Sequence, residues 1–467
     1  MNKQWLKIVS IVIVAIMIVT GCSSGNNSSG AGNEQSGGGN NSGADNKKVS
    51  ITLATVNNPD MVIMEKLAPK FKEETGIEVR FTVLPENELR NKVTADVGMG
   101  AGSFDIVTLG TYEVPFWGNN QWLEPLNPYF DNMNAEESEE YDKDDLIQPV
   151  INALSYDGTV YGLPFYAEST MMFYRKDLFE AAGLTMPEKP TWDEIYDLAV
   201  QLHNPDEGIY GICMRGLPGW GQNMFIFTQM LHTFGGKWFD MDWNPQFDSP
   251  KMRETFEFYK KLLTDAGEPS PHTVGYTECL TLMSSGKAAM WMDATVSGGT
   301  LMSGDSQVKD KIGYAMAPIV EKPYSGAVGG WALSIVSTSK HKEEAFRFLT
   351  WATSKKYVEM VGEEFGWERA PSGTRVSTYE NPKYKEAAPF AEITLESINN
   401  ANYEEPAVDP VPYKSSGWVS IPEYQEIGDQ VGQLFGAYLA GAKSLDDMLK
   451  EAQDFTTQVM KRGGYLK

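Results

Sequence analysis

Cysteine, histidine and positive charge are all scarce in this chain of 467 residues. It holds three cysteines and four histidines, and its 39 Lys and Arg residues are outnumbered by 63 Asp and Glu residues, which leaves a formal net charge of −24. The histidines lie far apart, so none belongs to a metal-ligand pair. A chain this acidic does not hold nucleic acid or an anionic membrane surface by charge. We therefore expect no nucleic-acid partner, no metal and no cofactor, and a ligand that is neutral or cationic.

Catalytic motifs are also missing. From residue 48 onward the sequence has no G-x-S-x-G nucleophile motif. The glycines at 98–103 (GMGAGS) fit neither of the common phosphate-binding patterns, and we interpret them as a turn between a helix and a strand. A chance pair of carboxylates suited to glycoside hydrolysis stays open, because acidic residues are plentiful. We expect a protein that is not an enzyme, with a secreted carbohydrate-active enzyme as the alternative.

The N-terminus has the pattern of an export signal. Lys3 and Lys7 precede a nearly unbroken apolar run at 8–19, which is too short for a comfortable membrane span. Thr20, Gly21 and Cys22 follow the run. This ending looks like a lipobox, whose cysteine is lipidated before cleavage. We predict a signal peptide at 1–21 and a lipid, such as palmitate, on Cys22. The alternative is an ordinary signal peptide that happens to end near a cysteine.

A tether follows this cysteine. Residues 23–46 are almost wholly Ser, Gly, Asn and Ala, a composition that cannot bury enough apolar surface to offset its conformational entropy. About 25 such residues span roughly 25–30 Å as a coil. We predict that 22–47 links a folded body to the outer face of the cell membrane, which the protein contacts through its lipid alone.

The two other cysteines, Cys213 and Cys279, lie in apolar contexts. Buried cysteines behave as small hydrophobic residues, and free thiols are common in such places. We expect two buried free thiols, with a single disulfide bridge as the alternative.

The remaining 420 or so residues exceed what one core usually organises, so we expect two domains. Strands at 49–56, 77–84 and 104–109 alternate with helices at 61–74 and 89–98, which predicts a parallel sheet with helices on both faces. Pro69 implies a kink or a later start in the first helix. Capping residues predict later helices after Thr191, Ser249 and Ser444. Apolar runs predict further strands at 158–165, 209–214, 288–292, 312–317 and 331–336.

Several segments place aromatic rings beside side chains that donate or accept hydrogen bonds. Rings pack against the C–H faces of a sugar or polyol, and carboxylates and amides bind its hydroxyls. Glu168 and Asp293 flank apolar strands, where an unpaired charge is costly; the alternative for both is a surface salt bridge, and for the rings it is core packing. We predict nine ligand-binding residues: Asn57, Tyr112, Glu113, Tyr166, Glu168, Trp220, Asn223, Asp293 and Trp331.

Four stretches resemble the family 1 solute-binding proteins of ABC sugar importers: 75–79 (TGIEV), 104–107 (FDIV), 161–168 (YGLPFYAE) and 172–184 (MFYRKDLFEAAGL). The resemblance runs from about residue 50 to the C-terminus. Four more are similar to the branch that binds sorbitol and mannitol: 215–221 (RGLPGWG), 291–295 (WMDAT), 367–375 (WERAPSGTR) and 421–424 (IPEY).

The resemblance implies an α/β fold of the two-lobed periplasmic-binding-protein class, of the maltose-binding-protein type, with the ligand in a cleft between the lobes. It implies a first lobe at 48–164 plus 317–360, a second at 165–316 plus 361–467, and crossings near 163–166 and 315–319. The function implied is capture of a neutral sugar or polyol by hinge closure and delivery to permease subunits in the membrane. We expect a monomer. A sugar-sensing adaptor that presents its ligand to a receptor is a further alternative.

Overall fold

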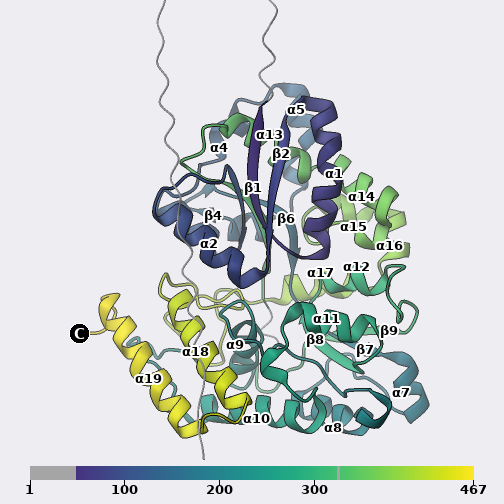
Figure 1. Cartoon of the computed structure of the whole chain (residues 1–467), viewed down its shortest axis with the longest axis vertical. Helices are drawn as coiled ribbons and strands as arrows, with labels where there is room; N and C mark the ends of the chain where they lie inside the picture. Colours follow the sequence, from purple (N-terminus) through teal and green to yellow (C-terminus); the bar gives the residue numbers. More distant parts are fainter. Residues whose placement is uncertain (1–48, 323–326) are drawn as a thin grey trace, which may run out of the picture. The chain divides into compact units, whose positions relative to one another are not determined.

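Two β-sheets organise the chain after its N-terminal segment (Figure 1). A computed structural model describes residues 49–322 and 327–467, so the predictions for the signal peptide, Cys22 and the tether lie outside the described residues. The first sheet has the strand order β2-β1-β3-β10-β6, and the second has the order β8-β7-β9. We call the parts built on the first and second sheets lobe one and lobe two.

The first sheet is mixed rather than parallel. β1 (Ser50–Val56) pairs in parallel with β2 (Glu78–Leu84) and β3 (Ile106–Gly110), as expected. β10 (Gly329–Ile335) is antiparallel both to β3 and to β6 (Leu163–Glu168). The parallel arrangement predicted for β1, β2 and β3 is confirmed. The sheet as a whole is mixed, because the chain re-enters lobe one after passing through lobe two and β10 runs in the opposite direction.

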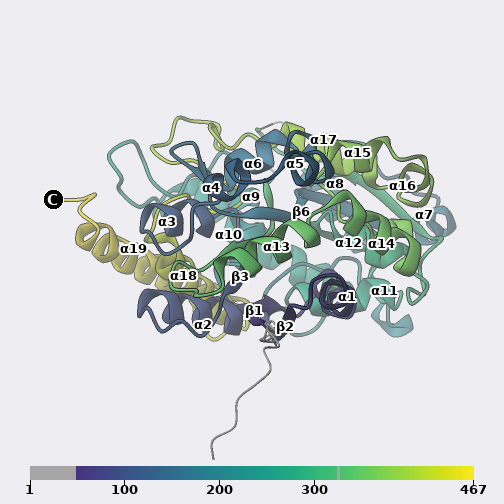
Figure 2. The same ribbon diagram turned by 90° about the horizontal axis from the view of Figure 1, so that it is seen from above.

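Two helices flank the β1–β2 edge. α1 (Pro59–Thr75) begins where the Asn58 side chain accepts a hydrogen bond from the Met61 amide, and it continues unbroken past Pro69, which is exposed. α2 (Glu86–Gly98) follows β2. Figures 1 and 2 show α1 and α2 on opposite sides of β1 and β2. The first helix therefore starts earlier than the sequence suggested.

The second sheet is wholly antiparallel. β7 (Thr170–Arg175) pairs on one side with β8 (Met290–Ala294) and on the other with β9 (Ile312–Met316). The strand expected at 209–214 does not form; that segment makes isolated bridges only, among them Tyr210 to Ala288 and Cys213 to Trp291. Between them Gly211 packs against the backbone of Ala199, where a side chain would not fit.

The capping residues predicted later helices correctly. α8 (Trp192–Leu202) begins with the Thr191–Glu194 capping box, and α10 (Pro250–Ala266) and α19 (Leu445–Arg462) follow Ser249 and Ser444. The other elements are α3 (Glu113–Asn119), α4 (Asn127–Asp131), α5 (Ala135–Tyr141), α6 (Gln148–Ala153), β4 (Ser155–Tyr156), β5 (Thr159–Val160), α7 (Lys176–Ala182), α9 (Asn223–Thr233), α11 (Tyr276–Ser284), α12 (Ser297–Met302), α13 (Lys342–Ala352), α14 (Lys355–Phe365), α15 (Val376–Glu380), α16 (Pro382–Ala387), α17 (Ala391–Asn400) and α18 (Tyr424–Leu439).

The chain passes from lobe one to lobe two within very few residues. β6 ends at Glu168 in the first sheet, and β7 begins at Thr170 in the second. The return runs from the end of β9 at Met316 to the start of β10 at Gly329. Glu168 therefore stands at the point where the two lobes meet. In the part of the chain that the structure describes, no helix has the length and apolar content to cross a membrane.

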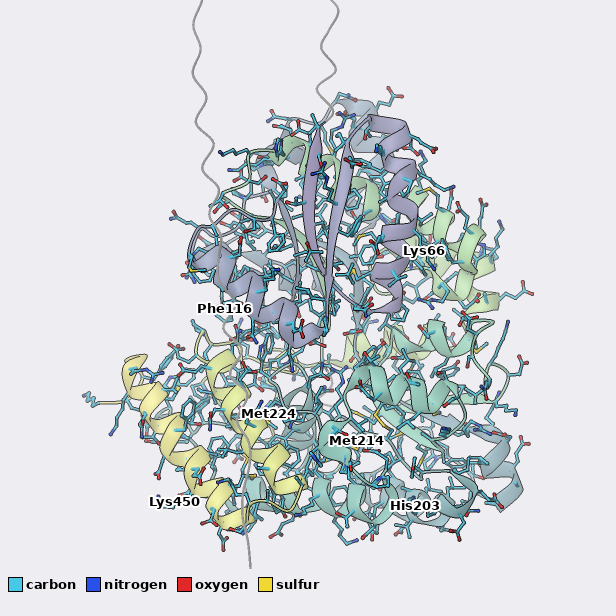
Figure 3. The ribbon with its side chains drawn as sticks, in the orientation of Figure 1. Lys66, Phe116, His203, Met214, Met224 and Lys450 are labelled. Carbon is cyan, nitrogen blue, oxygen red and sulfur yellow. A yellow bond between two sulfur atoms is a disulfide. The ribbon has the colours of Figure 1, made fainter. Side chains whose placement is uncertain are left out.

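Cys213 and Cys279 are joined by a disulfide, so the expectation of free thiols is wrong. Both cysteines are fully buried, and their Cα atoms are 5.6 Å apart. Cys213 precedes Met214, which is labelled in Figure 3, and Cys279 belongs to α11. The apolar surroundings that suggested isolated thiols are one shared cluster, which ties the segment beside β8 to this helix.

Candidate ligand-binding site

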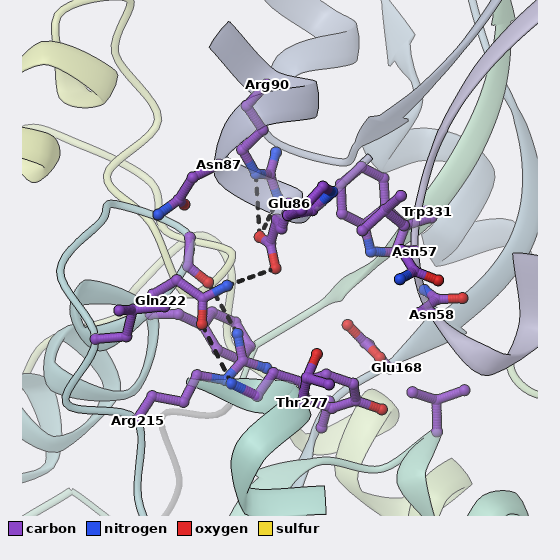
Figure 4. A pocket seen from close by; sticks show the side chains of 18 of the residues that line it. Asn57, Asn58, Glu86, Asn87, Arg90, Glu168, Arg215, Gln222, Thr277 and Trp331 are labelled. Atoms are coloured by element: carbon purple, nitrogen blue, oxygen red, sulfur yellow. Dashed lines mark hydrogen bonds and ion pairs between the residues drawn. The ribbon is translucent and has the colours of Figure 1, made fainter. Parts of the chain in front are cut away.

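A pocket of about 280 Å³ lies between the lobes (Figure 4). This volume is close to the lower end of the range of about 300–1,000 Å³ that small-molecule sites usually have, which favours a small ligand. Lobe one contributes Asn57, Asn58, Glu86, Asn87, Arg90, Tyr166, Glu168 and Trp331, and lobe two contributes Arg215, Gln222, Phe225, Tyr276, Thr277, Glu278 and Trp418, among others.

In the described part of the chain, five helices begin at the pocket, and four of them are longer than eight residues. Asn58 caps α1, Glu86 opens α2, Gln222 caps α9 and Tyr276 opens α11, and all four residues line the pocket. The N-terminus of a helix carries partial positive charge on its unpaired amides. Oxygen atoms of a ligand are therefore favoured at this place.

Arg90 is a buried cation of lobe one that contacts two carboxylates and two aromatic rings. Its Nη1 donates to Glu113 Oε1 at 2.6 Å, while its Nε and Nη2 donate to Glu86 Oε1 at 3.1 and 2.9 Å. The guanidinium lies between two rings, 4.0 Å from the centre of Trp220 and 4.6 Å from that of Trp331. Cation–π stacking and two carboxylates together fix its orientation.

Arg215 is the corresponding cation of lobe two. Its Nε and Nη2 donate to the two carboxylate oxygens of Asp293, at 2.9 and 2.5 Å, and its Nη1 donates to the Gly221 carbonyl at 2.8 Å. The rings of Phe225 and Tyr276 are each 5.0 Å from the guanidinium. Asp293 also accepts hydrogen bonds from the Trp291 indole and from the Ala294 amide. Each of its carboxylate oxygens therefore accepts two hydrogen bonds within the protein.

Glu168 is the carboxyl of the pocket that lacks such partners. It is 7% exposed, and its Oε2 has no hydrogen-bond partner among the described residues. Figure 4 shows its side chain facing the space between Trp331, Thr277 and Arg215. Burial raises the pKa of Glu168 to about 8; the positive charge of Arg215 opposes this shift, and the carboxylates of Asp293, Glu86 and Asp60 add to it.

Direct hydrogen bonds join the two lobes beside the pocket. Gln222 Nε2 donates to Glu86 Oε2 at 2.9 Å, and Asn87 Nδ2 donates to the Pro218 carbonyl at 3.2 Å. Tyr112 adds a third bond, from its hydroxyl to the Ile421 carbonyl at 2.7 Å. The lobes therefore contact each other along the edge formed by α2 and α3.

The structure brings four of the nine predicted residues to the pocket lining: Asn57, Tyr166, Glu168 and Trp331. Tyr166 is held by Asn58, whose Nδ2 donates to its hydroxyl at 2.9 Å. Asn57 is exposed and immediately precedes the cap of α1. Contact of these four side chains with a ligand stays a prediction, now supported by their position.

The other five lie behind the lining. Glu113 and Asp293 hold Arg90 and Arg215, and the Trp220 ring covers Arg90. Tyr112 and Asn223 are buried, the first bound to the Ile421 carbonyl and the second donating to the Gly216 and Gly432 carbonyls. Asp293 therefore forms a salt bridge, but a buried one rather than the surface pair weighed as the alternative. The sequence pattern found polar groups near the site but could not tell the lining from its support.

The sequence prediction missed the two arginines and the cross-lobe pair Glu86–Gln222. A signal for Arg215 was present, because Asp293 next to an apolar strand requires a buried cation as its partner. Arg90 had a similar signal in Glu113. Neither signal names the partner, since every arginine in the chain is a candidate. Among residues 49–322 and 327–467, no group of three or more His, Cys, Asp or Glu side chains is placed to hold a metal ion.

Comparison with known proteins agrees with this geometry. A family model described as bacterial extracellular solute-binding protein matches residues 55–359. The chain is 43% identical over 422 residues to the mannitol-binding protein of Pseudomonas aeruginosa, a match that covers 90% of this chain and 94% of that protein.

Solved structures show the same fold. A solute-binding protein of an ABC transporter from Agrobacterium vitis S4, crystallised with bound D-mannitol, is 45% identical with a TM-score of 0.86, covering 90% of this chain and 100% of that one. Maltose-bound MalE3 of T. maritima is 22% identical with a TM-score of 0.74, covering 88% and 100%. The predicted two-lobed α/β fold of the maltose-binding-protein type is confirmed.

Proposed function

This chain belongs to the family of bacterial extracellular solute-binding proteins, and we propose that it captures a small neutral polyol, such as mannitol, between its lobes and delivers it to the permease of an ABC importer. Its relatives are substrate-binding proteins of ABC transporters and not enzymes, so the protein binds its solute and leaves it chemically unchanged.

The observation that carries the proposal is the match between the pocket and a molecule made of hydroxyl groups. A guanidinium has five N–H donors. Arg90 and Arg215 each use three of them within the protein, which leaves two on each for a ligand. Glu168 supplies a carboxyl group whose Oε2 has no partner among the described residues, and Trp331 supplies a ring. Donors, a carboxyl group and an apolar face meet in a volume that suits a hexitol better than an oligosaccharide.

Capture requires the lobes to open and close, a recognised motion of such binding proteins. The bonds Gln222–Glu86 and Asn87–Pro218 lie beside the pocket and join opposite lobes. They would break on opening, together with the contact of Arg90 with Trp220. We expect ligand to favour the closed arrangement and to reduce the radius of gyration in solution scattering.

The proposed place of action is the outer face of the cell membrane. The family is extracellular. The finer proposal is that a lipid on Cys22 anchors the chain there, that residues 23–46 allow the folded body to move, and that the protein works as a monomer. The basic and apolar segments before Cys22 and the Ser, Gly and Asn composition after it support this proposal.

A thermal-shift and calorimetric screen tests the function. The panel contains D-mannitol, D-sorbitol, ribitol, D-glucose and maltose. A ligand at 100 times its Kd stabilises the folded protein by about 2.7 kcal/mol, and we expect this shift from at least one polyol and not from maltose. Glu168→Ala should abolish the shift, whereas Glu404→Ala, which removes an exposed carboxylate outside the pocket lining, should keep it.

Two results would contradict the proposal. One is the absence of any shift with all the polyols. The other is chemical conversion of the bound polyol in proportion to protein concentration, which chromatography of the recovered ligand would detect.

A further inference from the structure

Glu168 lies in surroundings that disfavour a negative charge. Glu168 is the last residue of β6 and is paired in register with Gly329 of β10; a Cβ added at Gly329 would come into van der Waals contact with the Glu168 side chain. The residue is 7% exposed, and no group in the described part of the chain bonds its Oε2. A carboxylate in such a place loses its hydration without gaining protein hydrogen bonds, which is a large cost.

The cations near Glu168 are already occupied by other acids. Asp293 takes Arg215 through both carboxylate oxygens, and the exposed fractions of the two side chains are 0% and 7%. Arg90 is bound by Glu113 and Glu86. A third arginine, Arg369, pairs with Asp60 at the start of α1, at 3.2 Å. Three arginines thus face four carboxylates before Glu168 is counted, and an ionised Glu168 would be the fifth.

The remaining neighbours are neutral apart from Glu278 of α11, an exposed acid of the pocket lining that accepts a hydrogen bond from the Gly275 amide. Tyr166 on β6 and Tyr276 on α11 interact electrostatically with Glu168. The Tyr166 hydroxyl accepts from Asn58, and the Tyr276 hydroxyl accepts from Ser297. β10 contributes Gly329 and Gly330, which carry no charge. Lysine and histidine are absent from the described residues that line the pocket.

We infer that Glu168 meets the ligand as a neutral carboxylic acid, that its O–H donates a hydrogen bond to a hydroxyl oxygen of the polyol, and that polyol affinity is lost as this proton dissociates at alkaline pH. The inference rests on the proposed function and adds to it a protonation state that selects the ligand. Carboxylic acids kept neutral by their surroundings act as hydrogen-bond donors in other proteins. The charge count and the burial set this state, and the raised pKa of about 8 agrees with it.

The arrangement also implies which ligands are refused. A neutral Glu168 and two arginines with remaining N–H groups present donors to the ligand, which suits hydroxyl oxygens. A cationic analogue such as an amino-alditol would need an ionised carboxylate as its partner. Glu168 in its neutral acid form does not provide one. We therefore expect D-mannitol to bind far more tightly than 1-amino-1-deoxy-D-mannitol at pH 6, where that amine is charged.

Calorimetric titration with D-mannitol from pH 6 to pH 9.5 tests the inference. If only the acid form binds, the apparent Kd rises in inverse proportion to the protonated fraction. With a pKa of about 8, the Kd at pH 9.5 should be roughly thirty times that at pH 6. At pH 9, binding should take up close to one proton per ligand, measured from the heats in two buffers of different ionisation enthalpy.

Glu168→Gln is the matched variant, because the amide has the same shape and donates N–H without titrating. We expect it to bind D-mannitol at pH 6 within about tenfold of the original chain and to show no pH dependence up to pH 9.5, whereas Glu168→Ala binds weakly throughout. Melting curves of both variants at each pH verify that they are folded.

Three results would overturn the inference. They are a Kd for the original chain that is constant or falls with rising pH, pH dependence that persists in Glu168→Gln, and binding by Glu168→Gln at pH 6 that is as weak as that of Glu168→Ala. If no polyol binds at any pH, the proposed function itself is wrong. If D-mannitol binds equally at all pH values, the function stands and the neutral acid does not.

Discussion

The guanidinium of Arg90 lies 4.0 Å from the centre of the Trp220 ring, so a cation of lobe one covers the flat face of a tryptophan of lobe two. The ring is 2% exposed and also contacts Tyr112, with 5.0 Å between the ring centres. Trp220 was expected to stack on a sugar. Its position instead assigns it to the support of Arg90 and to the contact between lobes.

Trp220→Ala should therefore destabilise the protein as well as weaken ligand binding. Loss of a buried tryptophan side chain costs about 3–5 kcal/mol, and we expect urea unfolding to show a loss of this size. Trp220→Phe keeps a ring over Arg90 and should lose much less. Unfolding of Trp220→Ala at the same urea concentration as the original chain would show that the ring is not part of the core.

The Arg215–Asp293 pair predicts a large effect of a small change. Asp293→Asn removes one charge and leaves the buried guanidinium uncompensated, which costs about 3–5 kcal/mol when one partner of a buried pair is lost. Chemical denaturation measures this loss. The exposed pair Lys450–Asp454 is the control, with Lys450 labelled in Figure 3, and Lys450→Ala should change stability by about 0–1 kcal/mol. Similar losses in both variants would contradict the buried ion pair.

Glu268 predicts a pH dependence of folding that does not involve the ligand. It follows α10, is 7% exposed, and neither carboxylate oxygen has a hydrogen-bond partner within the described residues. Burial raises its pKa from 4.5 to about 7. The folded state therefore holds the proton more tightly than the unfolded chain, so this contribution is complete below about pH 4.5, is lost as pH rises to about 7, and is then constant.

Glu268→Gln should remove this contribution. We expect the variant to gain stability relative to the original chain at pH 8 and to gain little at pH 4, as measured by urea unfolding at both values. Glu139→Gln alters an exposed carboxylate and serves as the control. Equal effects of Glu268→Gln at the two pH values would refute the buried acid.

The lipid anchor predicts a result that is independent of the fold. Cys22→Ser should abolish incorporation of labelled fatty acid and release the protein from the membrane fraction, while the melting temperature and polyol affinity of the folded body stay the same. Equal labelling of the original chain and the variant would show that Cys22 is not the lipidation site.

Local interactions are what the sequence by itself determined. The caps Thr191, Ser249 and Ser444 start helices where the sequence placed them, because each side chain accepts a hydrogen bond from the backbone amide three residues on. Short apolar runs predicted most strand positions, although no strand forms at 209–214. Glu168 and Trp331 were predicted because an acid and an aromatic ring stand on apolar strands, and the structure places both at the pocket lining.

The tertiary structure alone decided which polar groups form the pocket and which support it. Glu113 lies 23 positions from Arg90, and Asp293 lies 78 positions from Arg215, so no local pattern pairs them. The direction of β10 and the bridge between Cys213 and Cys279, 66 residues apart, are likewise set by how the chain returns to its own core. Segments that are far apart in the sequence are buried together, and this contact pairs Asp293 with Arg215 and Glu113 with Arg90 but gives Glu168 Oε2 no partner among the described residues. The order of residues along the chain does not show which acids will be paired.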